Sequence, residues 1–74
     1  MKTIEVKYLG VDDWHRAVYI TNDGTILKNI ELSSIPTQSN LSTVNRNCFN
    51  GEPDIPLIYN RQELSFAVVE HFTK

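Results

Sequence analysis

The sequence predicts a small, mainly β protein: an antiparallel meander or curled sheet, close to a partial barrel, of about four or five strands with a long polar loop. Apolar residues recur at every second position in several short runs, which is typical of strands with one solvent-exposed face. An Asn-Asp-Gly turn at 22–24 separates two such runs and is a strong hairpin signal. A content of 41% hydrophobic and 22% charged residues fits a folded globular chain.

The 74 residues allow a single domain, 1–74, near the size at which a hydrophobic core alone becomes marginal. Cys48 is the only cysteine, so an internal disulfide is excluded and a reducing compartment is expected. The first residues alternate polar and apolar side chains and lack the apolar run of a signal peptide. No stretch approaches the roughly 20 apolar residues of a membrane span. We expect a cytoplasmic protein without a membrane segment.

The first two strands are predicted at 3–11 and 16–21. Ile4, Val6 and Tyr8 alternate with polar residues in the first strand, whereas the second is almost continuously apolar. A continuous run of β-forming residues indicates a strand that is covered on both faces or flanked on both sides. The second strand should therefore lie in the middle of the sheet.

The third strand is predicted at 25–32, and two hairpin registers are open. A tight turn would place Ile20 opposite Leu27, whereas a three-residue loop with Gly24 in a left-handed bulge would place Ile20 opposite Ile26. We favour the bulge, because it keeps one apolar set on one face. That set is Val18, Ile20, Ile26, Ile30 and Leu32.

Residues 33–56 are dominated by polar residues, proline and glycine, which predicts either a long loop or a loop that contains one short helical turn. Leu41, Val44 and Cys48 have helical spacing, but their neighbours are poor helix formers. Both alternatives stay open. Phe49 is expected to anchor this segment on the core.

A short apolar run at 57–59 and a polar turn precede the last predicted strand, which begins at Leu64. Apolar residues alternate from there to Phe72. A helix over 61–71 also fits the spacing, but the Ser-Phe-Ala-Val-Val sequence favours a strand.

The candidate interaction site combines the only tryptophan with acidic residues of two segments. Trp14 is either an exposed binding anchor or, as we favour, a core residue at the end of the sheet. The acidic residues either converge on a cation or a partner arginine, or cap turns and form ion pairs, and their spacing matches no cation loop. The candidate residues are Asp12, Asp13, Trp14, Arg16, Glu52 and Asp54.

No catalytic, cofactor-binding or metal-binding residue is predicted. Cys48 could act as a nucleophile with His15 or His71, but nothing in the sequence places them together, and so short a chain has little room for a catalytic cleft. The glycines at 10, 24 and 51 are isolated and form no phosphate-binding loop. We therefore expect a protein that is not an enzyme and carries no cofactor.

A protein partner is the leading expectation, and a homodimer formed through a sheet edge is one version of it. The net charge of −2 and the dispersed Lys and Arg residues disfavour nucleic acid. The alternative is a nucleic-acid-associated protein in which tyrosines on a β surface stack on bases. Those tyrosines would be Tyr8, Tyr19 and Tyr59.

Two patterns carry a resemblance: Asp-Asp-Trp-x-Arg-x-Val-Tyr at 12–19, and Phe-x-Gly-Glu-Pro-Asp-x-Pro at 49–56. In both motifs and their order the chain resembles small uncharacterised proteins of bacterial conjugative elements and phages. A proline usually precedes the Val-Tyr pair in that pattern and an Asp precedes the Gly-Glu-Pro-Asp run, where this chain has Ala17 and Asn50. The resemblance implies an accessory or interaction module of a mobile element and implies no activity.

Overall fold

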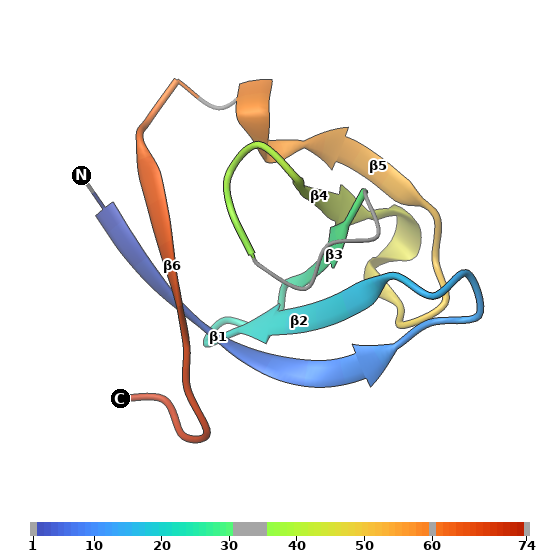
Figure 1. The fold of residues 1–74 in the computed structure, drawn as a ribbon, viewed down its shortest axis with the longest axis horizontal. Helices are drawn as coiled ribbons and strands as arrows, with labels where there is room; N and C mark the ends of the chain where they lie inside the picture. The colour runs from blue at the N-terminus through green and yellow to red at the C-terminus, as the bar shows by residue number, and fades with distance from the viewer. Residues whose placement is uncertain (1, 31–35, 60, 74) are drawn as a thin grey trace.

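The fold is a single curled sheet of six strands in the order β5-β4-β3-β2-β1-β6 (Figure 1). The structure is a computed structural model that describes residues 2–30, 36–59 and 61–73. The mainly β class predicted from the sequence is confirmed, with six strands in place of four or five. The strands are β1 (Lys2–Val11), β2 (Ala17–Thr21), β3 (Ile26–Asn29), β4 (Leu41–Val44), β5 (Pro53–Pro56) and β6 (Leu64–Val68); 3₁₀ turns η1 (Asn45–Asn47) and η2 (Leu57–Tyr59) follow β4 and β5.

Strands β1 to β5 form an antiparallel meander, of which the first three strands were predicted. The last strand differs, because β6 pairs with β1 in parallel, with Lys2 opposite Leu64 and Val6 opposite Val68. The chain ends the meander at the β5 edge, crosses through η2 and returns to the opposite edge (Figure 1). The sheet is therefore mixed, and β5 and β6 are its two edges.

The β2–β3 hairpin has the register predicted for the bulged turn, with Ile20 opposite Ile26. Gly24 has φ +88°, a conformation that glycine adopts without steric cost. The Thr21 amide donates to the Thr25 carbonyl at 2.9 Å and closes the three-residue loop. Val18, Ile20 and Ile26 share a face as predicted, Ile30 follows the end of β3, and Leu32 lies outside the described residues.

The hydrophobic core lies on the other face of the sheet. Its buried residues are Val6, Ala17, Tyr19, Leu27 and Leu41, against which Ile4, Leu57 and Phe66 pack. Strand β2 is an interior strand, and Ala17, Val18 and Tyr19 are all buried. The prediction of a central second strand covered on both faces is confirmed.

The polar stretch contains more regular structure than predicted. Leu41 and Val44 lie in strand β4, so the helical interpretation of their spacing is wrong. A short helical turn follows at η1, where Arg46 and Asn47 have positive φ. The last predicted strand is confirmed as β6, which ends at Val68.

Candidate interaction surface around the β1–β2 turn

Asp12 organises the turn that joins β1 to β2. Its Oδ1 accepts hydrogen bonds from the backbone amides of Trp14 (2.9 Å) and Arg16 (2.8 Å). Its own amide donates to the Arg16 carbonyl at 3.0 Å, and its carbonyl accepts from the His15 amide at 3.0 Å. An aspartate that binds backbone amides two and four residues ahead fixes a turn without help from regular structure. This turn projects at the right of Figure 1.

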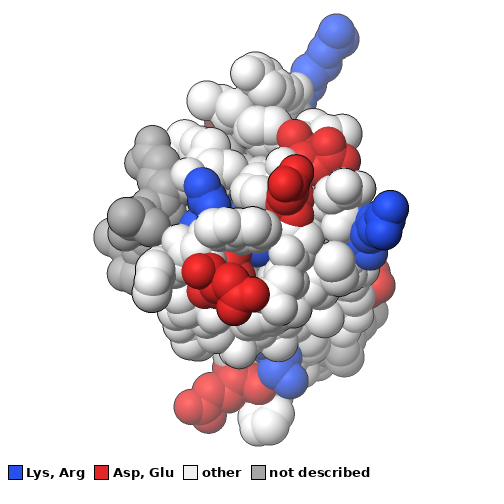
Figure 2. Space-filling view, turned by 90° about the vertical axis from the view of Figure 1, so that its right-hand side faces the viewer, with Lys and Arg blue, Asp and Glu red and all other residues white. Residues whose placement is uncertain are grey.

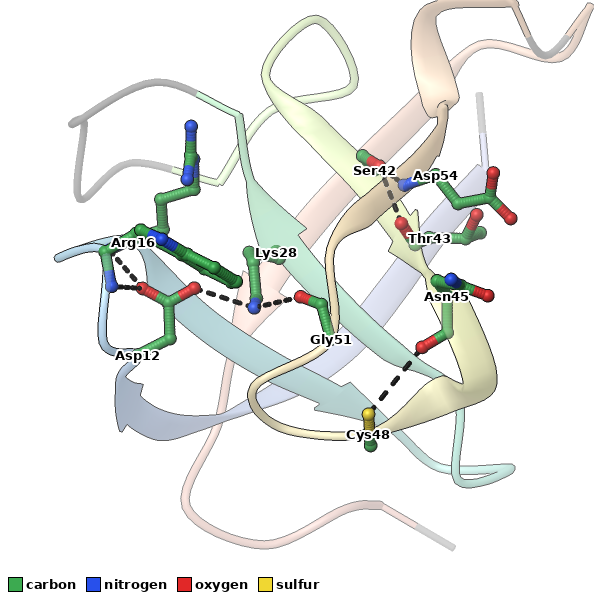
Figure 3. Close-up of polar contacts among 10 residues, drawn as sticks. Asp12, Arg16, Lys28, Ser42, Thr43, Asn45, Cys48, Gly51 and Asp54 are labelled. Carbon is green, nitrogen blue, oxygen red and sulfur yellow. Dashed lines mark hydrogen bonds and ion pairs between the residues drawn. The ribbon is translucent and has the colours of Figure 1, made fainter.

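A buried ion pair anchors the same aspartate to the sheet. Lys28 Nζ lies 2.7 Å from Asp12 Oδ2, and both side chains have 0% of their surface exposed. Lys28 Nζ also donates to the Gly51 carbonyl at 2.6 Å. Figure 3 shows the lysine between the aspartate and the glycine. One β3 side chain thus joins the β1–β2 turn to the loop before β5.

The environment keeps Asp12 ionised. Burial by itself would raise the pKa of the carboxyl group, but hydrogen bonds from Lys28 and from the Arg16 and Trp14 amides lower it more, so the pKa is below its usual value. A carboxylate that accepts several hydrogen bonds and pairs with a cation is stabilised in its charged form. Asp12 is therefore ionised at neutral pH.

The segment after β4 packs closely against this anchor. A Cβ on Gly51 would lie 2.5 Å from the Asn45 carbonyl oxygen and 2.6 Å from Cγ1 of Val44, so no side chain fits there. The partly buried Phe49 approaches β1, because a Cβ on Gly10 would lie 3.7 Å from its Cζ. Phe49 therefore anchors the segment on β1 at Gly10, whereas the hydrophobic core, on which this anchoring was expected, does not include it.

Asn47 attaches the same segment to the β2–β3 hairpin. Its side-chain oxygen accepts from the Ile26 amide at 2.7 Å, and its side-chain nitrogen donates to the Gly24 carbonyl at 2.9 Å. The side chain therefore replaces a strand partner at the start of β3. Lys28 and Asn47 hold the segment at two points.

Trp14 lies on the outside of the turn. Its surface is 47% exposed, so the favoured prediction that it is a core residue is wrong. Lys28 Nζ lies 5.4 Å from the ring centroid, within the range of a cation–π interaction. The indole thus contacts the buried lysine and also presents a large area to solvent. Other exposed large apolar residues in this part of the chain are Tyr8, Leu9 and Val11.

The candidate acidic residues do not converge. Asp13, Glu52 and Asp54 are exposed, whereas Asp12 is buried in its ion pair. In Figure 3 the Asp54 side chain points away from Asp12, and the Asp54 backbone amide donates to Ser42 Oγ at 3.1 Å. Within the described ranges, no three His, Cys, Asp or Glu side chains are grouped as metal ligands.

Arg16 and Cys48 differ in burial. Arg16 is partly buried, and its Nε has no hydrogen-bond partner among the described residues. Cys48 is exposed, and its Sγ lies 3.7 Å from the Asn45 carbonyl oxygen.

Lys28 is the residue of the candidate site that was not predicted from the sequence. Lys28 lies two residues after Ile26 and two residues before Ile30, so its side chain falls on the predicted apolar face. A lysine on such a face requires a buried counter-charge, and the acidic pair at 12–13 precedes the strand that pairs with β3. A lysine on the predicted apolar face, together with this acidic pair, was the sequence signal for the buried ion pair.

The surface around this turn carries mixed charge. Figure 2 views the molecule from the right-hand side of Figure 1, and Lys and Arg side chains are interspersed with Asp and Glu on that face.

Of the three tyrosines, Tyr19 is buried, whereas Tyr8 and Tyr59 are 53% and 77% exposed.

A separate open groove of about 520 Å³ lies away from this turn. Its apolar lining comes from Ile4, Leu27, Leu57 and Leu64, and its polar lining includes the hairpin residues 21–23. No lining residue belongs to 8–16 or 45–54. The groove and the Trp14 surface are therefore distinct features.

Comparisons of the chain with protein families, with curated proteins and with solved structures found no match. Within the part of the chain that the structure describes, no helix has the length and apolar character needed to cross a membrane.

Proposed function

We propose that the protein is a small non-enzymatic interaction module that binds a protein partner through the surface around Trp14. The observation that carries the proposal is the contrast within the β1–β2 turn: Trp14 is 47% exposed, yet its turn is fixed by an ion pair with 0% exposure. An exposed indole on a fixed turn suits a binding anchor, because little conformational freedom is lost when a partner covers it.

The neighbouring residues extend this surface. Leu9 and Val11, in the last part of β1, are 43% and 50% exposed. Contiguous exposed apolar patches rimmed by polar residues mark protein contact sites. Asp13 and His15 flank the indole in the turn and are exposed, so they supply a polar rim.

The biological context of the proposed interaction rests on the two motifs at 12–19 and 49–56. Their resemblance to proteins of conjugative elements and phages supports an accessory role in a bacterial mobile element, in the cytoplasm. In that role the partner would be another protein made from the same element.

The test is affinity capture from cells that express the protein, with Trp14→Ala as the main variant and Tyr59→Ala as the matched control. Both residues are exposed aromatics, but Tyr59 lies in η2. We expect a partner captured by the wild type and the control to be lost with Trp14→Ala. A Glu52→Gln/Asp54→Asn variant then tests whether the loop before β5 contributes. Unchanged recovery with all variants would contradict the proposal.

An alternative function is association with nucleic acid, supported by the exposure of Tyr8 and Tyr59. Tyr19 and Lys28 are buried, so Tyr19 is not available to stack on bases and Lys28 is not available to contact phosphates. Fluorescence anisotropy with single-stranded DNA at low and high salt discriminates the two functions, because phosphate contacts make binding strongly salt-dependent.

A further inference from the structure

We propose that β6 is a self-association edge, through which two copies of this chain pair as antiparallel strands centred on Ala67. This surface is separate from the Trp14 surface.

The backbone of β6 presents alternate residues to β1 and to the outside. The Lys2 amide donates to the Glu63 carbonyl at 3.1 Å, and the Val69 amide donates to the Val6 carbonyl at 2.9 Å. Residues 63 and 69 thus face β1, and so do 65 and 67, because orientation alternates along a strand. The backbone groups of Leu64, Phe66 and Val68 therefore point outward.

The two edges of the sheet differ in their capacity to pair. On β5, Pro53 and Pro56 have no amide hydrogen, and the Asp54 and Ile55 amides donate to side-chain oxygens of β4. Prolines and short length are common protections of an edge strand. On β6 the sequence Leu-Ser-Phe-Ala-Val contains no proline and no charge. Among the described strands, β6 is the edge that retains free amide donors.

The occupied donor on β6 selects the register. The Leu64 amide already donates to Gln38 Oε1 at 3.0 Å, so a pairing centred on Phe66, which would place Leu64 opposite Val68, loses that donor. A pairing centred on Ala67 places Phe66 opposite Val68 of the second copy and uses only free groups. Each such pair exchanges both of its backbone hydrogen bonds. The second copy is thus the partner that this edge fits.

The side chains agree with this register. Val68 is 52% exposed, whereas Phe66 packs against the core. Pairing would place Val68 of each copy beside Phe66 of the other on the same face, and aromatic and β-branched residues are favourable cross-strand neighbours. Ala67 would face Ala67, where two small side chains leave the backbones free to approach.

The C-terminal tail leaves the edge accessible. After β6 the chain turns back toward β1, where the Thr73 amide donates to Glu5 Oε1 at 2.9 Å and Phe72 lies 5.6 Å from Lys7 Nζ. These contacts attach residues 72 and 73 to side chains of β1, and they use none of the outward backbone groups of Phe66 or Val68.

The test is sedimentation velocity of the purified protein from micromolar to millimolar concentration, with Val68→Pro and Val68→Ala as paired variants. Proline removes the outward amide of Val68 and leaves the bonds to β1 in place, whereas alanine keeps that amide. We expect the wild type and Val68→Ala to approach twice the chain mass of 8.5 kDa at high concentration, and Val68→Pro to remain at the single-chain mass. A wild type that stays at the single-chain mass throughout, or equal association of both variants, would overturn the proposal.

Two further measurements keep the proposal testable if Val68→Pro does not fold. Hydrogen exchange of the wild-type Phe66 and Val68 amides should slow as concentration rises, and exchange independent of concentration would count against the pairing. Trp14→Ala should associate like the wild type. If it does not, the copies meet through the Trp14 surface and the β6 proposal fails, while the proposed function stands.

Discussion

Lys28 and Asp12 form an ion pair of 2.7 Å with no solvent-exposed side-chain surface. Removal of two charges from water costs several kcal/mol per ion, about as much as their attraction returns. Here the Gly51 carbonyl accepts a further hydrogen bond from Lys28, and two turn amides donate to Asp12. We infer that the pair specifies one arrangement of the β1–β2 turn and the loop before β5, rather than adding stability beyond an apolar core.

Replacement of the lysine alone should be severely destabilising. In Lys28→Met the Asp12 carboxylate stays buried without a counter-charge, and loss of one partner of a buried pair costs about 3–5 kcal/mol. That is a large share of the roughly 5–15 kcal/mol that stabilises an ordinary domain. Urea unfolding measures the loss. The matched control is Lys2→Met, where the lysine is exposed. A similar loss of stability at both positions would contradict a buried ion pair at Lys28.

The double variant Asp12→Asn/Lys28→Met should recover part of the stability lost in Lys28→Met. Asparagine removes the unpaired charge but keeps a side-chain oxygen for the Trp14 and Arg16 amides. Because the two residues contact each other, their effects should not add. A double variant as unstable as the sum of the two single variants would show that the residues act independently.

The free energy of unfolding should fall in acid, and Asp12 should contribute to that fall. Folding lowers the pKa of Asp12 because the Lys28 and backbone hydrogen bonds outweigh burial. Its stabilising contribution is therefore fully present above the unfolded-state pKa, about 3.9, and is lost as pH falls through the lower folded-state pKa. Glu5 and Asp23, whose pKa values are lowered by hydrogen bonds from threonines, act in the same direction.

Unfolding midpoints measured from neutral pH down to about pH 2 test this dependence. Asp12→Asn should show a shallower loss of stability in acid than the wild type. Asp13→Asn is the control, because Asp13 is an exposed neighbour in the same turn. The attribution to Asp12 fails if Asp12→Asn and the wild type lose stability in parallel.

The sequence predicted the features that local chemistry determines. The Asp-Gly turn sets the hairpin register through the backbone freedom of Gly24, and the continuous apolar run of β2 could only be covered on both faces. Strand β6 was predicted from the same kind of signal, because Phe66 and its neighbours are β-forming residues.

The sequence could not supply the features that depend on partners distant in the chain. Strand β4 has only four residues within a polar stretch, and Ser42 is buried there because β3 and β5 flank it. Trp14 is exposed because Lys28, 14 positions further on, takes the buried position beneath the turn. The parallel pairing of β6 with β1 depends on the path of the chain after β5, which no local pattern specifies.

Gly51→Ala should destabilise the loop before β5 by overpacking, at a cost of about 1–3 kcal/mol. The added methyl would meet the Asn45 carbonyl oxygen at 2.5 Å and Val44 at 2.6 Å, and the Gly51 carbonyl that binds Lys28 would have to move. Thermal unfolding measures the effect. Gly24→Asn is the comparison, because no atom lies within 4 Å of its added Cβ and asparagine tolerates positive φ. A smaller loss for Gly51→Ala than for Gly24→Asn would contradict the close packing.

Removal of the Asn47 side chain should loosen the β2–β3 hairpin without unfolding the sheet. Its two hydrogen bonds to the Ile26 amide and the Gly24 carbonyl are exposed, and hydrogen bonds of this kind contribute about 0.5–1.5 kcal/mol each. Asn47 has φ 51°, so Asn47→Gly removes the side chain without backbone strain, whereas Asn47→Ala adds strain. We expect the Ile26 amide to exchange faster in both variants, and Asn47→Ala to be the less stable. Unchanged exchange at Ile26 in Asn47→Gly would show that the side chain does not hold the hairpin.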